Sequence, residues 1–252
     1  MSILDNEIDL VNNNDVIIRS FIETNYDIVG SYTIKDNIVD IDGDVFVANK
    51  NIKSLTNGLF SFGVVDGYFS CDNCELLTTL KGAPKEISRS FDCRNCDSLT
   101  SLEGAPKVVG GSFDCYYCTS LKSLEGAPEK VKKHFVCIHC KSLKSLEGSP
   151  KVVGENFNCS FCISLKSLEG SPREVGKDFV CSYCESLISL EGSPEKVDGD
   201  FKCSSCKSLI SLEGAPKEVG GDFDCGYCPS LKTLEGVPKE VDKDFYCDSL
   251  KS

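Results

Sequence analysis

Paired cysteines are the residues of this sequence best suited to chemistry. Seventeen of the 252 residues are cysteine, and they fall into two files with one spacing. A first cysteine recurs every 22 residues, and a second follows three residues after each of the first eight. The first file consists of Cys71, Cys93, Cys115, Cys137, Cys159, Cys181, Cys203, Cys225 and Cys247, and the second file of Cys74, Cys96, Cys118, Cys140, Cys162, Cys184, Cys206 and Cys228. Thiolates at this spacing bind metals, so all seventeen are candidate metal ligands.

Adjacent pairs match the spacing of known four-thiolate sites. Two neighbouring pairs read C-x2-C-x18-C-x2-C, which lies within the zinc-ribbon range. If the repeats stack, two of them supply four sulfurs, which suit Zn²⁺ or an iron–sulfur cluster. Zinc would need sulfurs about 3.8 Å apart, closer than the roughly 4.8 Å between paired strands. This comparison favours [4Fe-4S] clusters over zinc, and a row of such centres would permit electron transfer or storage with a redox partner.

Two other roles for the cysteines remain open. Free cysteine is a small buried hydrophobe, so the pairs would then be packing residues without a ligand. Disulfides are the third alternative. The opening residues lack a basic segment followed by an apolar one, so we expect no Sec-type signal peptide and a cytoplasmic chain with reduced thiols. His139 lies between Cys137 and Cys140 as an auxiliary ligand or, in our preferred interpretation, as an exposed turn residue.

The composition argues against three classes of function: nucleic-acid binding, membrane association and catalysis. The chain carries 27 Lys and Arg against 39 Asp and Glu, a net charge of −12. Without clustered cations we predict no binding to nucleic acid. No apolar stretch approaches the roughly 18 residues of a membrane span, so we predict no membrane association. With two histidines and no Ser/His/Asp cluster, we expect a protein that is not an enzyme.

The cysteines lie in a longer repeat that must position them. The unit reads F-x-C-x-x-C-x-S-L-x-S-L-E-G-[AS]-P-x-x-V-x-x-x, with phenylalanine two residues before each first-file cysteine. A fixed period in the twenties is typical of a solenoid, since one unit is too small to bury its own apolar face. Each unit contains a proline and lacks helical periodicity. The sequence therefore predicts a β-rich solenoid of stacked short parallel strands and turns.

The repeat resembles the leucine-rich repeat over roughly residues 44 to 250. Phe91-x-Cys93-x-x-Cys96-x-x-Leu99 occupies the family's L-x-L-x-x-[NC] stretch, and the next leucine comes one residue later than in the family consensus. The unit is also similar to repeats of uncharacterised bacterial and phage proteins. The leucine-rich-repeat resemblance implies our alternative function, a protein-interaction scaffold with buried structural thiols.

Residues 1–68 differ from the repeats and are predicted to form an N-terminal cap. Apolar residues between Val16 and Ile22 follow the N-cap candidate Asp15 and predict a helix that ends near Asn25. Two strands, 38–42 and 44–48, are expected to form a hairpin that turns at Asp42-Gly43.

A degenerate repeat links this cap to the regular ones. Asn49, Ile52 and Leu55 match Cys96, Leu99 and Leu102, and Phe46 is placed where the first cysteine would be.

Residues 69–252 comprise eight repeats and a truncated final one, without a second cysteine after Cys247. We expect this last repeat to be open and to permit self-association.

Overall fold

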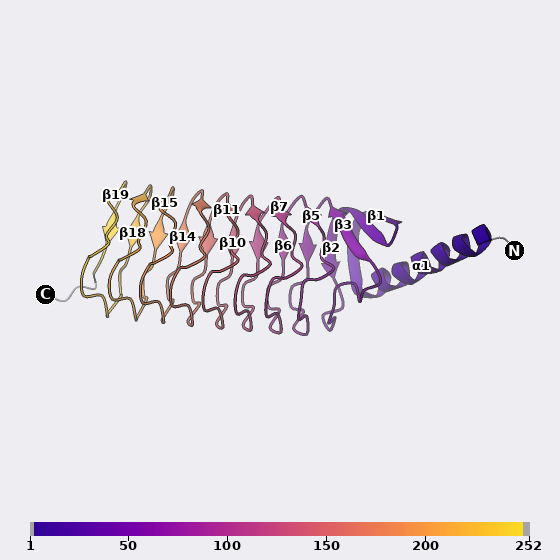
Figure 1. Cartoon of the computed structure of the whole chain (residues 1–252), viewed down its shortest axis with the longest axis horizontal. Helices are drawn as coiled ribbons and strands as arrows, with labels where there is room; N and C mark the ends of the chain where they lie inside the picture. The colour runs from indigo at the N-terminus through magenta and orange to yellow at the C-terminus, as the bar shows by residue number, and fades with distance from the viewer. Residues whose placement is uncertain (1–2, 249–252) are drawn as a thin grey trace.

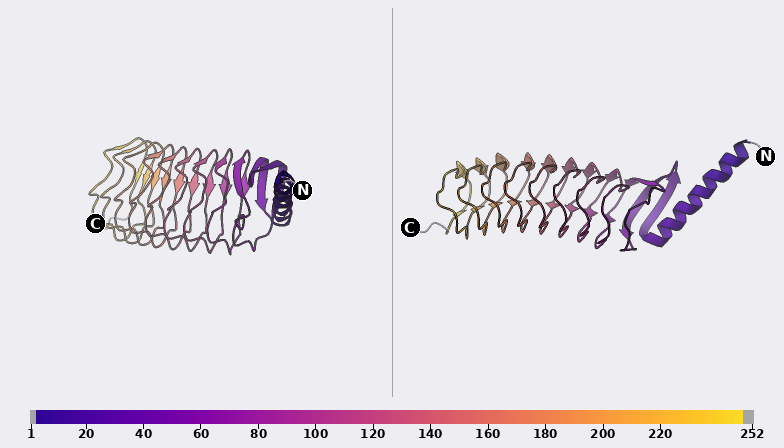
Figure 2. Two further views of the ribbon diagram at one scale, coloured as in Figure 1. Left: turned by 45° about the vertical axis from the view of Figure 1, so that its right-hand side comes forward. Right: turned by 60° about the horizontal axis from the view of Figure 1, so that its bottom comes forward.

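The chain forms a parallel β-solenoid with a helix and a hairpin at its N-terminal end. The structure is a computed structural model and describes residues 3–248. Successive turns stack along a rod, and helix α1 (Ile3–Asn25) projects from one end of it (Figures 1 and 2). The predicted fold class is confirmed. Among the described residues, no helix combines the length and the apolar character that crossing a membrane requires.

Each repeat contributes two very short strands. The strands that begin with the repeated phenylalanine are β4 (Phe69–Ser70), β6 (Phe91–Asp92), β8 (Phe113–Asp114), β10 (Phe135–Val136), β12 (Phe157–Asn158), β14 (Phe179–Val180), β16 (Phe201–Lys202), β18 (Phe223–Asp224) and β20 (Phe245–Tyr246). The other strands of the repeats are β5 (Glu86–Ile87), β7 (Val108–Val109), β9 (Lys130–Val131), β11 (Val152–Val153), β13 (Glu174–Val175), β15 (Lys196–Val197), β17 (Glu218–Val219) and β19 (Glu240–Val241).

Pairing between turns is in register at a separation of 22 residues. Phe157, for example, pairs with Phe135 on one side and Phe179 on the other. From Phe69 to Phe245 the rings stack with centroids 5.1–5.4 Å apart and planes within 17° of parallel. The two leucines of each repeat are buried with this phenylalanine ladder, except Leu234 in the last full repeat, which is exposed. The core is therefore continuous from turn to turn, as a solenoid requires.

Polar side chains also form a ladder at the residue before each phenylalanine. Asp178 Oδ1 accepts a hydrogen bond from the Asp200 N–H at 3.0 Å, and Asp200 Oδ1 accepts one from the Asp222 N–H at 2.9 Å. Asp222 accepts from the Asp244 N–H in the same way. These carboxylates therefore satisfy backbone donors where the chain bends between strands.

The N-terminal cap was predicted with its hairpin turn in the wrong place. Strands β1 (Tyr26–Lys35) and β2 (Ile38–Val47) pair along their whole length and turn at Asp36-Asn37, whose φ angles are 52° and 56°. Positive φ at both central residues is what a tight two-residue hairpin needs. Gly43 instead pairs with Gly30 inside the sheet, where a Cβ on Gly30 would lie 2.1 Å from the Asp42 oxygen. The helix ends at Asn25, as predicted, but begins well before Asp15.

The degenerate repeat also needs a correction. Strand β2 pairs with β3 (Ser61–Val65) and with β4, and Val45 is in register with Phe69. Val45 therefore takes the phenylalanine position, while Phe46 pairs with Ser70 and packs against Tyr68 with ring centroids 5.7 Å apart. Side chains alternate between the faces of a strand, so Phe46 lies off the file of first cysteines.

The last described turn presents apolar side chains. Strand β20 pairs with β18, and its Phe245 and Tyr246 are 38% and 50% exposed. Self-association through this turn stays a prediction.

Candidate functional site

The two cysteine files run side by side inside the rod, as the 22-residue period predicts. Every cysteine from Cys71 to Cys228 has a side chain with 0% exposure, and Cys247 in the last turn is half-buried. No disulfide links the cysteines from Cys71 to Cys206. The sulfurs therefore belong to the packed core.

The second-file thiols are engaged with the backbone of the neighbouring turn. Seven of the eight donate to the carbonyl oxygen of the first-file cysteine 25 residues earlier, as Cys162 does to Cys137 at 3.2 Å. The same contact recurs at 3.1–3.3 Å from Cys96 to Cys228. A buried polar group needs a partner, and this one satisfies both the thiol and the carbonyl.

The same contacts place the Cys118 thiol beside Cys93 and the Cys162 thiol beside Cys137. Burial, followed by these contacts, raises the pKa of both Cys93 and Cys137 well above the ordinary value. Burial likewise raises the pKa of Cys162 to about 11. At neutral pH these groups are protonated thiols, because desolvation disfavours the thiolate.

This donor set does not fit a four-thiolate site as it stands. A metal needs deprotonated sulfur, whereas the second-file thiols use their protons on carbonyl oxygens. Within residues 3–248, no three or more Cys, His, Asp or Glu side chains lie close enough together to hold a metal ion. The assignment of all seventeen cysteines as ligands stays a prediction, and their shared burial and register are what the structure adds to it.

A row of ring-bearing side chains, distinct from the two cysteine files, lies on the outside of the turn between paired cysteines. Tyr117, His139, Phe161 and Tyr183 follow one another at intervals of 22 residues. Their ring centroids are 4.9, 4.5 and 4.4 Å apart along the series. We call these four residues the aromatic file. Tyr183 is 46% exposed, so the file reaches the surface of the rod.

The backbone of the aromatic file is unusual for such large residues. All four have φ between 59° and 61°, the left-handed region. Asn73 and Asn95 hold the same position in the first two repeats, and the Asn95 side-chain amide donates to that of Asn73 at 2.9 Å. Asparagine tolerates this conformation far better than an aromatic residue does. The turn therefore forms without rings, and the rings must have another role.

A lysine side chain places a positive charge beside the aromatic file. The Lys141 ammonium lies 5.4 Å from the centre of the Tyr117 ring. Partial burial, followed by repulsion from Lys141, lowers the pKa of His139. His139 is therefore neutral near pH 7; its uncharged ring stacks on Phe161 and contacts Tyr117 at a tilt of 47°.

The sequence predicts this surface only in part. His139 was interpreted as a turn residue, and Tyr117 and Tyr183 also lie between paired cysteines. Phe161 was missed, although its position 22 residues after His139 was the available signal.

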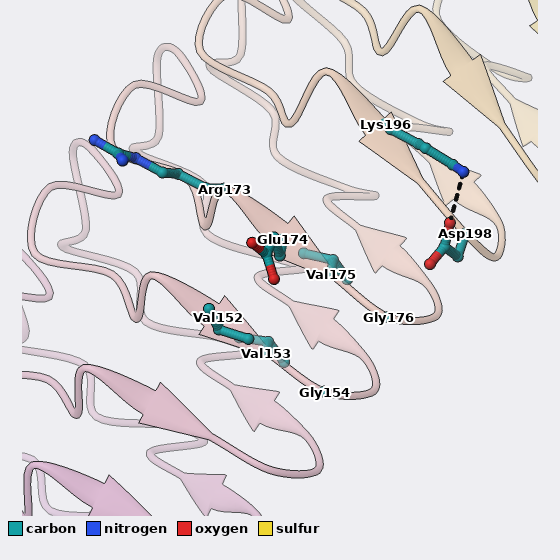
Figure 3. Close-up of a pocket in the computed structure, with 9 residues that line it drawn as sticks. All are labelled: Val152, Val153, Gly154, Arg173, Glu174, Val175, Gly176, Lys196 and Asp198. Atoms are coloured by element: carbon teal, nitrogen blue, oxygen red, sulfur yellow. Dashed lines mark ion pairs between the residues drawn. The ribbon is translucent and has the colours of Figure 1, made fainter.

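A separate surface pocket of about 400 Å³ lies where the strand ladder is interrupted. Strands β15, β17 and β19 form a sheet of their own, split from β13 and the larger sheet. Figure 3 shows that the pocket is lined from three successive turns, with Lys196 and Asp198 joined by an ion pair of 3.3 Å. None of its lining residues is a cysteine or belongs to the aromatic file.

Comparison with known proteins adds no assignment. No family model, no curated protein and no solved structure matches this chain.

Proposed function

We propose that this chain is a non-enzymatic interaction scaffold that binds a protein partner along the aromatic file. The observation that carries the proposal is the placement of three large aromatic rings and an imidazole in left-handed backbone positions. Solenoids offer long, regular surfaces of this kind for binding. The buried thiols then serve as packing residues, and their reduced state suits a cytoplasmic location.

The energetics support a role outside folding. For a residue other than glycine, the left-handed backbone conformation costs roughly 1–2 kcal/mol of stability. Each stacked pair of rings offsets about 0.5–1.5 kcal/mol of this. The rings thus leave the stability of the turn nearly unchanged, while exposed aromatic side chains are the residues that dominate binding at protein interfaces. Backbone strain held at a surface position is a common sign of a functional site.

Replacing His139 and Phe161 together by asparagine tests the proposal. We expect the free energy of unfolding to change by no more than about 1 kcal/mol, because relief of backbone strain offsets the lost stacking. Partner affinity should fall by about tenfold or more, as loss of central aromatic contacts does at interfaces. Partners retained by the wild type and lost by the variant are identified by quantitative mass spectrometry, then purified and titrated calorimetrically against both proteins.

Ile188→Asn with Ile210→Asn is the matched control. Both isoleucines are exposed, and they occupy one repeat position in successive turns outside the aromatic file. If this pair weakens the purified partner as much as the aromatic pair does, binding does not depend on the aromatic file and the proposal fails.

A metal-binding solenoid, with [4Fe-4S] clusters or zinc and a role in electron transfer or storage, is the second candidate. It is favoured by the shared burial of the two cysteine files, which run in register along the rod. Elemental analysis of anaerobically purified protein tests it, and stoichiometric iron or zinc is the supporting result. Substituting Cys159→Ala with Cys162→Asn should then lower the metal content. A folded, metal-free protein would exclude this candidate.

A further inference from the structure

The repeat position that carries the aromatic file continues beyond Tyr183, but one repeat has no ring there. After Tyr183 the next position holds Ser205, and the one after that holds Tyr227. All three have nearly the same backbone conformation, with φ of 60°, 60° and 55°. In-register turns with one backbone conformation project their side chains in the same direction. The file is therefore interrupted by a gap one ring wide, which we call the Ser205 gap and define by Tyr183, Ser205 and Tyr227.

Small residues lie beside the gap. The Tyr183 N–H donates to the Ser204 oxygen at 2.9 Å, and the Ser205 N–H donates to the Gly226 oxygen at 2.8 Å. The turns on either side of Ser205 therefore keep their regular spacing. Tyr183 and Tyr227 are 46% and 74% exposed, so neither ring is covered by the other.

Two carboxylates lie next to Gly226. A Cβ on this glycine would be 3.0 Å from Asp248 Oδ1 and 3.2 Å from Asp224 Oδ1. Both oxygens are held in place, since Asp224 accepts the Gly226 N–H at 2.9 Å and Asp248 accepts the Tyr227 N–H at 2.8 Å. The charged residues after the neighbouring cysteines, Glu185 and Lys207, neutralise each other in an ion pair of 2.6 Å. Lys202, on the same turn as Ser205, is paired with Asp200 at 2.8 Å, so the carboxylate of Asp224 leaves the charge beside the gap negative.

The size and charge of the gap select a flat cation. Two turns of a parallel ladder span about 10 Å, which leaves room for one planar group between two rings. An arginine guanidinium is planar, so it stacks flat on aromatic faces and also pairs with carboxylates. A lysine ammonium pairs with carboxylates but has no flat face to stack. The overall charge of −12 also attracts a basic partner.

We propose that the Ser205 gap binds an arginine side chain of a partner peptide, stacked between Tyr183 and Tyr227 with its charge facing Asp224. This inference rests on the proposed scaffold function and names the chemistry of its partner.

The test is a titration of the full chain with a fluorescently labelled peptide that has one arginine flanked by glycine and serine. Matched peptides carry lysine or citrulline, which keep the charge or the planar shape alone. At physiological salt we expect saturable binding of the arginine peptide and about tenfold weaker binding of the citrulline peptide. Ser205→Tyr fills the gap without changing the charge and should reduce arginine binding by about tenfold.

Asn95→Tyr is the matched control, because it adds the same ring in the same backbone conformation beyond the other end of the aromatic file. It should leave arginine binding unchanged. Tyr227→Ala removes one wall and serves as the second variant if Ser205→Tyr unfolds; it too should lose binding. Equal binding by wild type and a folded Ser205→Tyr, equal binding of the citrulline peptide, or no binding at millimolar peptide would overturn the inference.

The outcome is separable from that of the scaffold proposal. His139→Asn with Phe161→Asn keeps Tyr183, Ser205 and Tyr227 and should retain the arginine peptide while losing the partner. Loss of the partner in that variant, together with failure of the arginine peptide in the wild type, would reject the gap and leave the scaffold standing.

Discussion

Phe157→Ala is expected to lower the free energy of unfolding by about 3–5 kcal/mol, the usual cost of deleting a fully buried aromatic ring. Phe157 is completely buried and stacks on Phe135 and Phe179 with centroids 5.4 and 5.1 Å away. Because each turn contacts only its neighbours, the damage falls on the two interfaces that this ring joins. Chemical denaturation followed by far-ultraviolet circular dichroism should show a lower midpoint, and hydrogen exchange should show protection lost first around residues 135–179.

Phe245→Ala provides the comparison. Phe245 stacks on Phe223 and is 38% exposed, so its removal should cost much less. If both variants lose the same stability, the phenylalanine ladder does not hold the turns together and this account of the core is wrong.

Gly148→Ala is the second substitution with a large expected effect, a loss of more than about 2 kcal/mol. Gly148 has a φ of 86°, and an added Cβ would lie 2.5 Å from the Glu125 nitrogen of the preceding turn. The methyl group therefore meets rigid backbone and forces two turns apart. Thermal unfolding monitored by circular dichroism measures the loss.

Gly58→Ala separates steric conflict from backbone strain. Gly58 also has a positive φ, 74°, but nothing lies within 4 Å of its would-be Cβ. This variant should lose only about 1 kcal/mol, the cost of the left-handed conformation. Similar losses for the two variants would mean that close stacking of the turns does not constrain Gly148.

The parts of the fold that could be predicted are those that the period determines. A spacing of 22 residues without insertion puts Phe135, Phe157 and Phe179 in one file before any coordinates are known. Phe and the first Cys of each repeat are two residues apart, so in an extended strand both side chains point to the same face, toward the core. Burial of the cysteine files followed from these two facts.

What the period could not supply was the direction of side chains within each turn. The second cysteine follows a residue in the left-handed region, and that conformation directs Cys162 toward the Cys137 carbonyl of the previous turn. The predicted four-sulfur geometry had assumed that neighbouring pairs converge. The hairpin was misplaced for a related reason: Asp36-Asn37 and Asp42-Gly43 are both good turn sequences, and only the pairing of Gly30 with Gly43 shows which one lies within the sheet.

The repeated in-register pairing of successive turns also means that the rod can change in length without a change in how its core residues pair. Removing or inserting a whole 22-residue unit would preserve the register of the core pairs, because Phe pairs with Phe and Val with Val in successive turns. Recombination between such units in a gene would therefore alter the reach of the protein in steps of about 4.8 Å. The length of such a protein therefore changes by whole repeats, gained or lost one at a time.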